Sequence, residues 1–113
     1  AKPVLYPNVA FSLAEDVASK KFERGLLLCG TGIGMAISAN KVAGIRAAQC
    51  HDTYSAERAS RSNDAQIITI GARVVGPELA KAIVDSWLNS TFDGGRSQPK
   101  VDLINAYQPK ACC

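Results

Sequence analysis

The sequence contains a single histidine and few aromatic residues, and all of its apolar runs are short. A membrane-spanning helix needs about 20 consecutive apolar residues, and no run approaches that length, so we expect no membrane segment. The first residues, Ala1 to Leu5, are too short for a signal peptide. We therefore expect a cytoplasmic protein.

Cysteine is present, but in no pattern that indicates a bridge or a metal site. The four cysteines stand at positions 29, 50, 112 and 113, and they form neither a Cys-x-x-Cys pair nor a zinc-binding spacing. We therefore expect no disulfide scaffold and no metal. The Cys112-Cys113 pair is interpreted as a terminal tail without a role.

Charge of either sign is never concentrated. The formal net charge is +3, and the basic side chains are dispersed without interleaved aromatic residues. A nucleic-acid interface would cluster them, so we expect no nucleic-acid partner, and the mild positive balance suits a small anionic substrate. The 113 residues, 47% of them hydrophobic, are enough for one domain with its own core, which we place at residues 1–113.

The chain is organised around the stretch from Gly25 to Met35. Residues 25–29 include no charged or hydroxyl side chain, which predicts a strand buried on both faces. Glycines follow at alternate positions before a helical pattern resumes: Gly30, Gly32 and Gly34. Alternate glycines let backbone N–H groups turn toward one point, and the N-terminus of the following helix adds positive potential. We expect a strand, an anion-binding turn and a helix.

The position of Cys29 at the edge of this turn suggests chemistry. A thiolate is the reactive form of cysteine, and a helix N-terminus favours it, so one hypothesis is a thiolate base or nucleophile beside an oxyanion hole. The alternative is that Cys29 packs as a small hydrophobic residue at a strand end. A dinucleotide site is less well supported, because Gly30-x-Gly32-x-Gly34 is not the G-x-G-x-x-G pattern and no Walker lysine follows it.

Helices and strands alternate along the rest of the chain. Helices are predicted over residues 6–20, 33–40, 54–61 and 77–88, with a last amphipathic segment over 101–107, and strands over 25–29, 45–50 and 67–71. Asp52 or Thr53 can cap the third helix. In the fourth helix a core face is predicted that consists of Leu79, Ala80, Ile83, Val84, Trp87 and Leu88. The alternation favours an α/β fold with a parallel sheet and helices on both faces.

A parallel sheet binds ligands at the carboxyl ends of its strands. Residues 29–34, His51 and residues 71–73 should gather at that edge. His51 is the only imidazole, but a lone histidine at a strand exit is more often an exposed or capping residue than a catalyst. Three strands also leave a sheet edge that needs a partner, so we expect either that part of the domain is absent from this chain or that another chain covers the edge.

Seven motifs in succession resemble one known family. They are Cys29-Gly-Thr-Gly-Ile-Gly-Met35, Ala39-Asn-Lys41, Gly44-Ile-Arg-Ala-Ala48, Tyr54-Ser-Ala56, Asn63-Asp64, Gly71-Ala-Arg-Val-Val-Gly76 and Gly94-Gly-Arg96, within residues 6–104. The ordered set is similar to the ribose-5-phosphate isomerase B family, which includes galactose-6-phosphate isomerase subunits. The resemblance implies a Rossmann-like three-layer α/β sandwich and a cofactor-free aldose–ketose isomerase. It also implies a homodimer or a dimer of dimers with shared active sites, in which the C-terminal segment, residues 94–113, reaches a partner subunit.

The resemblance also implies roles for individual residues. Cys29 would be the base that moves a proton between C1 and C2 of a phosphorylated sugar, ribose 5-phosphate and ribulose 5-phosphate above all, through an enediolate. Thr31 would act beside it as a second catalytic residue. The implied oxyanion- and substrate-binding residues are Gly30, Gly32, Ile33, Gly34, Asn63 and Arg73, and the implied phosphate-binding residues are Arg96 and Lys100. From the residues alone, the charged side chains of Arg73, Arg96 and Lys100 would be interpreted as solvated surface groups.

The sequence departs from the family pattern in four places. The family's N-terminal strand-helix-strand segment with its Asp-His pair does not precede Tyr6, serine stands at 62 and 97 where histidine is expected, and Lys100 replaces an arginine. The histidine expected at 62 opens the furanose ring, and serine cannot shuttle protons as imidazole does. A tetrose 4-phosphate cannot close a furanose, so erythrose or erythrulose 4-phosphate is an alternative substrate, unless His51 opens the ring from another direction.

Three further interpretations are compatible with these residues. The substrate could be a hexose 6-phosphate. The chain could also be a non-catalytic subunit of a hetero-oligomer that supplies Arg96 and Lys100 to a partner's site, although the retained Cys29 and Thr31 argue against this. A nucleotide-binding regulatory domain, the third interpretation, predicts affinity for ATP or NAD.

Overall fold

The computed structural model describes residues 4–107, and this part of the chain folds into three strands, five α-helices and one short 3-10 helix. The elements are α1 (Tyr6–Ala18), β1 (Gly25–Cys29), α2 (Ile33–Ala39), β2 (Ala47–Gln49), α3 (Thr53–Arg61), β3 (Ile67–Gly71), α4 (Pro77–Leu88), η1 (Gly95–Ser97) and α5 (Gln98–Ala106). None of these helices is both long and apolar enough to cross a membrane. The Cys112-Cys113 pair and the last six residues of the predicted C-terminal segment lie outside the described residues.

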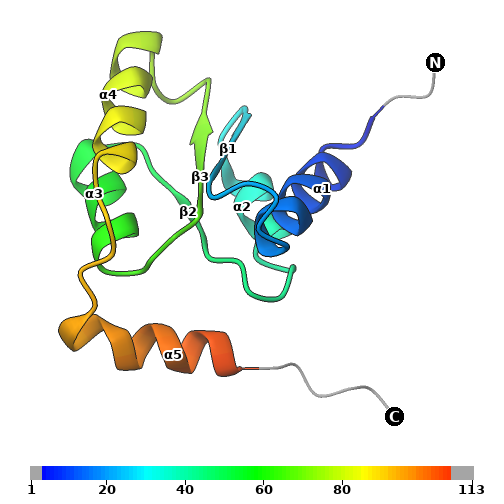
Figure 1. Ribbon diagram of the computed structural model, residues 1–113. Coiled ribbons are helices and arrows are strands. Elements are labelled where there is room, and N and C mark those ends of the chain that lie inside the picture. The colour runs from blue at the N-terminus through cyan, green and yellow to red at the C-terminus, as the bar shows by residue number, and fades with distance from the viewer. Residues whose placement is uncertain (1–3, 108–113) are drawn as a thin grey trace.

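The three strands form one parallel sheet in the order β1-β3-β2. Helices α1 and α2 lie on one face of the sheet, and α3 and α4 lie on the other (Figure 1). The register pairs Cys29 with Gly71, so β1 and β3 end side by side. This confirms the predicted three-layer α/β fold and brings the ends of β1 and β3 to the same edge of the sheet.

Two apolar cores fill the spaces between the layers. One lies under α1 and α2 and includes Leu27 and Met35, and the other lies under α3 and α4 and includes Ile68 and Trp87. Trp87 is a core residue, as predicted, and its indole N–H donates to the Ala65 carbonyl at 3.1 Å. The central strand β3 contributes to both cores because all five of its residues are buried.

The expectation that β1 is buried on both faces is wrong. Leu26 and Leu28 are 39% and 55% exposed, whereas Leu27, on the opposite face, is buried. The reason is that β1 is an edge strand. The helices cover the central strand β3 completely but cover only part of β1. An apolar groove remains there, lined by Leu26, Leu28, Ile70, Ala80, Lys81, Val84 and Asp85. The predicted core face of α4 is too wide, since Leu79 and Leu88 are 44% and 53% exposed.

Element ends follow local hydrogen bonds. Pro7 and Pro77 lie in the first turns of α1 and α4, as their fixed φ favours. Helix α1 ends at Ala18, shortly before Lys20 adopts a positive φ of 69°. Strand β2 is shorter than the predicted 45–50, because the amide of Arg46 donates to the Gln66 side chain instead of joining the ladder.

The N-terminus of α3 is capped by Asp52 rather than by Thr53. One carboxylate oxygen accepts the Ser55 amide at 2.6 Å, and the other accepts the Ser55 hydroxyl at 2.7 Å. The bond from the Ser55 amide, supported by the hydroxyl, lowers the pKa of Asp52 below its ordinary value. This cap starts the helix directly after His51 and so fixes where the histidine lies.

Candidate active site

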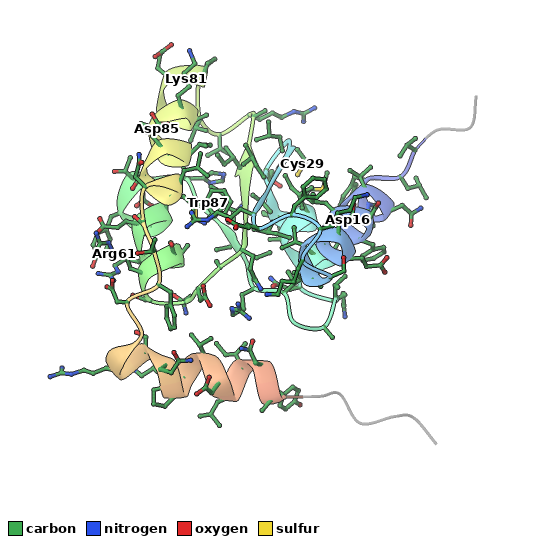
Figure 2. All side chains as sticks on the ribbon, viewed as in Figure 1. Asp16, Cys29, Arg61, Lys81, Asp85 and Trp87 are labelled. Atoms are coloured by element: carbon green, nitrogen blue, oxygen red, sulfur yellow. The ribbon has the colours of Figure 1, made fainter. Side chains whose placement is uncertain are left out.

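Cys29 lies at the carboxyl end of β1, half-buried, at the start of the glycine turn (Figure 2). The backbone amide of Gly32 donates to Sγ of Cys29 at 3.0 Å. Gly32 adopts φ +78°, and a Cβ there would lie 3.1 Å from the backbone carbon of Ile70, so only glycine fits. The turn therefore points an N–H group at the sulfur.

Thr31 presents its side chain on the outside of the same turn. Its Oγ1 accepts the amide of Ile33 at 3.2 Å, which leaves the hydroxyl proton free to donate to a ligand. Its backbone packs against Gly71, where a Cβ would lie 2.7 Å from Cα of Thr31. The end of β3 thus supports the turn from below, and Gly71 is a place where only a bare backbone fits.

Arg73 reaches the turn from the loop after β3. Its amide donates to the Gly30 carbonyl at 3.0 Å, and the neighbouring Ala72 amide donates to the Cys29 carbonyl at 2.8 Å. The Cδ and Nε atoms of Arg73 lie 3.6 and 3.7 Å from the position that a Cβ on Gly30 would occupy. The structure therefore brings a guanidinium group to the glycine turn, as the sequence predicted.

His51 lies at the same edge of the sheet but is held by the backbone. Its Nε2 accepts the amide of Gly71 at 2.9 Å. A ring nitrogen that accepts a hydrogen bond carries no proton, so neutral His51 holds its proton on Nδ1. The imidazole supports the end of β3, which agrees with the simpler interpretation of this residue.

Two residues at this edge were missed by the sequence analysis. The side-chain amide of Gln49 donates to the Thr31 carbonyl at 2.6 Å, and the hydroxyl of Thr69 donates to the Gly32 carbonyl at 2.7 Å. Thr69 could have been found from the sequence because it is the one hydroxyl side chain in an otherwise apolar strand, and a buried polar group needs a hydrogen-bond partner. Gln49 could have been found as a polar side chain at the end of a predicted strand.

Tyr6 is a further contact that the sequence did not reveal. Its phenol packs directly against Cα of Gly34, in the first turn of α2, and leaves no room for a Cβ there. Gly34 is therefore required by a neighbour from α1 and not by its own backbone angles, since its φ is negative.

The remaining three predicted site residues lie away from Cys29. Asn63 is in the connection between α3 and β3, at the amino end of the sheet, whereas Cys29 is at the carboxyl end. Arg96 is in η1 and Lys100 is in α5, and both side chains are exposed. Figure 1 shows α5 beyond the amino end of the sheet, and Figure 2 shows Cys29 at the other end. Within one chain, the structure does not bring Asn63, Arg96 or Lys100 to the glycine turn.

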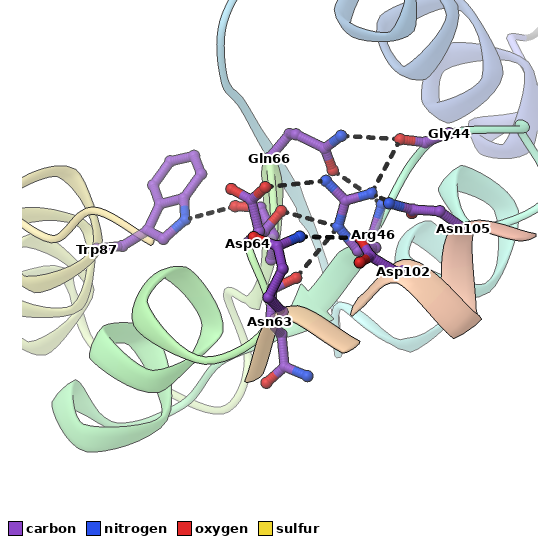
Figure 3. Close-up of polar contacts among 10 residues, drawn as sticks. Gly44, Arg46, Asn63, Asp64, Gln66, Trp87, Asp102 and Asn105 are labelled. Atoms are coloured by element: carbon purple, nitrogen blue, oxygen red, sulfur yellow. Dashed lines mark hydrogen bonds and ion pairs between the residues drawn. The ribbon is translucent and has the colours of Figure 1, made fainter. Parts of the chain in front are cut away.

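Asn63 instead lines a cavity of about 790 Å³ beside the start of β2. Its polar lining includes Asn40, Lys41, Arg46 and Asn105, and α5 closes one side of it. Arg46 organises this region (Figure 3): its guanidinium donates to the carbonyls of Asn63 and Asp64 and to the Asn105 side chain. Burial lowers the pKa of Arg46, against the opposing effect of the Asp64 carboxylate. Arg46 thereby ties α5 to the body of the chain.

Cys50 contrasts with Cys29. It is 1% exposed, and burial, together with the nearby Asp52 carboxylate, raises the pKa of its thiol to about 11. Its S–H group faces the Ala48 carbonyl at 3.7 Å. A neutral buried thiol of this kind is inert, so Cys29 is the better nucleophile or base of the two.

The glycine turn thus combines a sulfur that accepts the Gly32 amide, a threonine hydroxyl whose proton is free to donate, and a guanidinium group. Groups of this kind suit the removal of a carbon-bound proton next to a carbonyl, because they stabilise the oxyanion that forms.

Comparison with known proteins agrees with this chemistry. The ribose/galactose isomerase family matches residues 1–104. The chain is 62% identical over 104 residues to D-erythrulose-4-phosphate isomerase of Pectobacterium atrosepticum, covering 92% of this chain and 68% of the relative. It is 60% identical over 107 residues to ribose-5-P isomerase B of Listeria innocua, covering 95% and 72%.

Solved structures also match the chain. Ribose-5-phosphate isomerase B of Clostridium thermocellum superposes with a TM-score of 0.89 at 47% identity, over 92% of this chain and 70% of the other. The type B ribose 5-phosphate isomerase of Trypanosoma cruzi superposes with a TM-score of 0.90 at 44% identity, over 93% and 71%.

Proposed function

We propose that this chain, which belongs to the ribose/galactose isomerase family and is an aldose–ketose isomerase of phosphorylated sugars, acts on a linear tetrose 4-phosphate such as erythrulose 4-phosphate. Cys29 is the proton-transferring base, and the glycine turn holds the reacting oxygen. We place the reaction in the cytoplasm, where a phosphorylated substrate is made and kept.

The observation that carries the choice of substrate is the bond between His51 and Gly71. The 113 residues contain one histidine, and its Nε2 already accepts the Gly71 amide at 2.9 Å. Position 62, where a ring-opening histidine would stand, is a serine at the C-terminal end of α3. Ser62 has no imidazole, and Nε2 of His51 is already bonded to the backbone, so the chain has no histidine with both ring nitrogens available for opening a sugar ring. A substrate that is already open needs none.

The relatives support the same choice without deciding it. One of them is named for erythrulose 4-phosphate and another for ribose 5-phosphate, at 62% and 60% identity. Ribose 5-phosphate is therefore the second candidate, and it is favoured by the solved structures, which carry that name.

The proposed reaction moves one proton between adjacent carbons. The Cys29 thiolate takes a proton from C1 of the ketose, and the electrons of the broken C–H bond form the C1–C2 double bond of an enediolate. The carbonyl electrons move to O2, where the amides of the turn and the Thr31 hydroxyl stabilise the negative charge. The Cys29 thiol then returns the proton to C2, a proton moves from O1 to O2, and the aldose is formed. No atom is gained or lost.

We also infer that a second copy of the chain completes each site. Asn63, Arg96 and Lys100 are at the far end of the molecule from Cys29, so one chain has the base and the oxyanion hole but not the remaining groups. In a symmetric dimer, each copy can present Arg96 and Lys100 to the phosphate held at the partner's glycine turn. Lys100 supplies charge there, although not the two-pronged geometry of arginine.

The test is a comparison of the tetrose and pentose phosphates on the same protein. We expect the full chain to isomerise erythrulose 4-phosphate with a kcat/KM about a hundredfold above that for ribose 5-phosphate, the scale of one missing acid–base catalyst. In deuterium oxide, the product should carry deuterium at the carbon that receives the proton. Ser62→His should raise turnover of ribose 5-phosphate and not that of the tetrose. Efficient ribose 5-phosphate turnover by the unaltered protein would reject the tetrose assignment.

A further inference from the structure

We infer that Gln49 and Thr69 are positioning residues for the isomerisation, because they fix two consecutive peptide groups of the glycine turn from behind. Their side-chain hydrogen bonds go to the backbone of the turn, at the Thr31 and Gly32 carbonyls. The inference rests on the proposed role of Cys29 as the base.

Gln49 acts on the peptide between Thr31 and Gly32. The carbonyl of this peptide accepts the Gln49 side-chain amide at 2.6 Å, and its N–H donates to Sγ of Cys29 at 3.0 Å. A trans peptide is planar, with its C=O and N–H pointing in opposite directions. A donor that holds the carbonyl therefore also holds the N–H on the sulfur, and it polarises the peptide in the direction that strengthens the second bond.

Thr69 acts on the next peptide, between Gly32 and Ile33. Its hydroxyl donates to the Gly32 carbonyl at 2.7 Å, and the Ile33 amide on the other side of the same peptide donates to Oγ1 of Thr31. Thr69 is fully buried in the central strand β3, so its hydroxyl has little freedom to move. This bond fixes the direction in which the Thr31 hydroxyl is presented.

The two anchors come from different strands on the same side of the turn. Gln49 is the last residue of β2, and Thr69 is paired with it in the β2–β3 ladder. The Gly32 carbonyl also accepts the Ala36 amide of α2 at 3.2 Å, so the second peptide is held by strand and helix together. Gly32 adopts a left-handed φ of +78°, and because glycine has more conformational freedom than other residues, the peptides beside it keep one orientation only when neighbouring groups hold them.

The experiment uses variants that remove a donor and keep the shape. Thr69→Val and Gln49→Met lose the hydroxyl and the amide, whereas Thr69→Ser keeps the hydroxyl. Ser86→Ala is the matched control, because the Ser86 hydroxyl donates to the Thr53 carbonyl at 2.9 Å, between α3 and α4 and away from the turn. For each protein, we would measure kcat and KM with erythrulose 4-phosphate, the free energy of unfolding, and the rate at which iodoacetamide alkylates Cys29.

Thr69→Val and Gln49→Met should each lower kcat about tenfold or more, as small misplacements of reacting groups do, with KM little changed. Thr69→Ser should restore kcat, and Ser86→Ala should keep it. Gln49→Met should also alkylate more slowly at Cys29, because the Gly32 amide no longer faces the sulfur. Variants that lose stability but keep both kcat and the alkylation rate would overturn the inference. Since alkylation needs no substrate, this result tests the positioning role even if the proposed substrate is wrong.

Discussion

The amide of Gly32 and the sulfur of Cys29 are joined by a 3.0 Å hydrogen bond across the glycine turn. The side chains of Gln49 and Thr69 hold the two peptide groups of the turn on either side of Gly32. Cys50, 21 positions further along the chain, is buried and has no such donor among residues 4–107. The two thiols should therefore react at very different rates.

We predict that iodoacetamide at pH 8 modifies Cys29 and abolishes isomerisation, while Cys50 stays intact in the folded protein. Burial raises the pKa of Cys50 to about 11, so only about one molecule in a thousand carries a Cys50 thiolate at this pH. Peptide mass spectrometry locates the label, with Cys112 and Cys113 replaced by serine in every sample. Cys29→Ser, which lacks the base, is the control for labelling, and its folded form should take up no label at position 29 or at Cys50. Modification of Cys50 before Cys29 would contradict the prediction.

A second prediction concerns the contact between Gly71 and Thr31. In Gly71→Ala the new Cβ would lie 2.7 Å from Cα of Thr31, so the turn must move. We expect kcat to fall and the free energy of unfolding to drop by about 2 kcal/mol, as is typical of overpacked sites.

Gly76→Ala is the matched control for Gly71→Ala. Within the described part of the chain, a Cβ on Gly76 meets nothing within 4 Å, and the residue has an ordinary φ of −79° at the start of α4. Denaturant unfolding and steady-state kinetics on both variants make the comparison. Equal kcat values in the two variants would show that the turn tolerates displacement by β3.

The position of this turn could be predicted from the sequence because its signals are local. An apolar run, a cysteine and alternate glycines lie within ten consecutive residues, 25–34, and they produce a strand, a turn and a helix in that order. Its supports could not be predicted in the same way. Gln49 and Thr69 act across the sheet, and Tyr6 acts from α1, so their roles depend on how distant segments pack.

The residues proposed to be shared between copies were harder still to place. The family resemblance predicted that Asn63, Arg96 and Lys100 bind the substrate. Only the folded chain shows that they lie away from Cys29. The exposed leucines of β1 have a similar origin. An apolar run predicts burial, but whether Leu26 and Leu28 are covered depends on what lies beside an edge strand.

A third prediction concerns the Asp52 cap of α3 and its dependence on pH. The Ser55 amide and hydroxyl lower the pKa of Asp52 in the folded state. A depressed carboxyl pKa contributes stability above the unfolded value, and that contribution disappears as pH falls through the folded value. Asp52→Ala should therefore be less stable than the parent at pH 7, and the difference should shrink below about pH 4.

Asp52→Asn separates the charge of this cap from its geometry. Asparagine also caps helices well but does not titrate, so this variant should stay close to the parent at pH 7 without the acid-dependent loss. Urea midpoints at pH 7 and pH 3 give the comparison. A parent–alanine difference that is the same at both values would show that the Asp52 charge contributes nothing.

The shared site can be tested by mixing two inactive variants. Cys29→Ala lacks the base, and Arg96→Ala lacks a proposed phosphate ligand from the far end of the chain. If each site takes Cys29 from one copy and Arg96 from its partner, a mixed dimer has one site with both lesions and one intact site. Random mixing makes half of the dimers mixed, so co-refolding equal amounts should restore about a quarter of the parent activity.

Each variant refolded alone is the control for the mixing experiment and should stay inactive or nearly so. Size-exclusion chromatography confirms that both variants assemble as the parent does. Recovery in the mixture requires that Cys29 and Arg96 act from different chains, since no single chain in the tube contains both. A mixture no more active than the average of its two components would mean that each chain completes its own site, with η1 and α5 folding back toward β1.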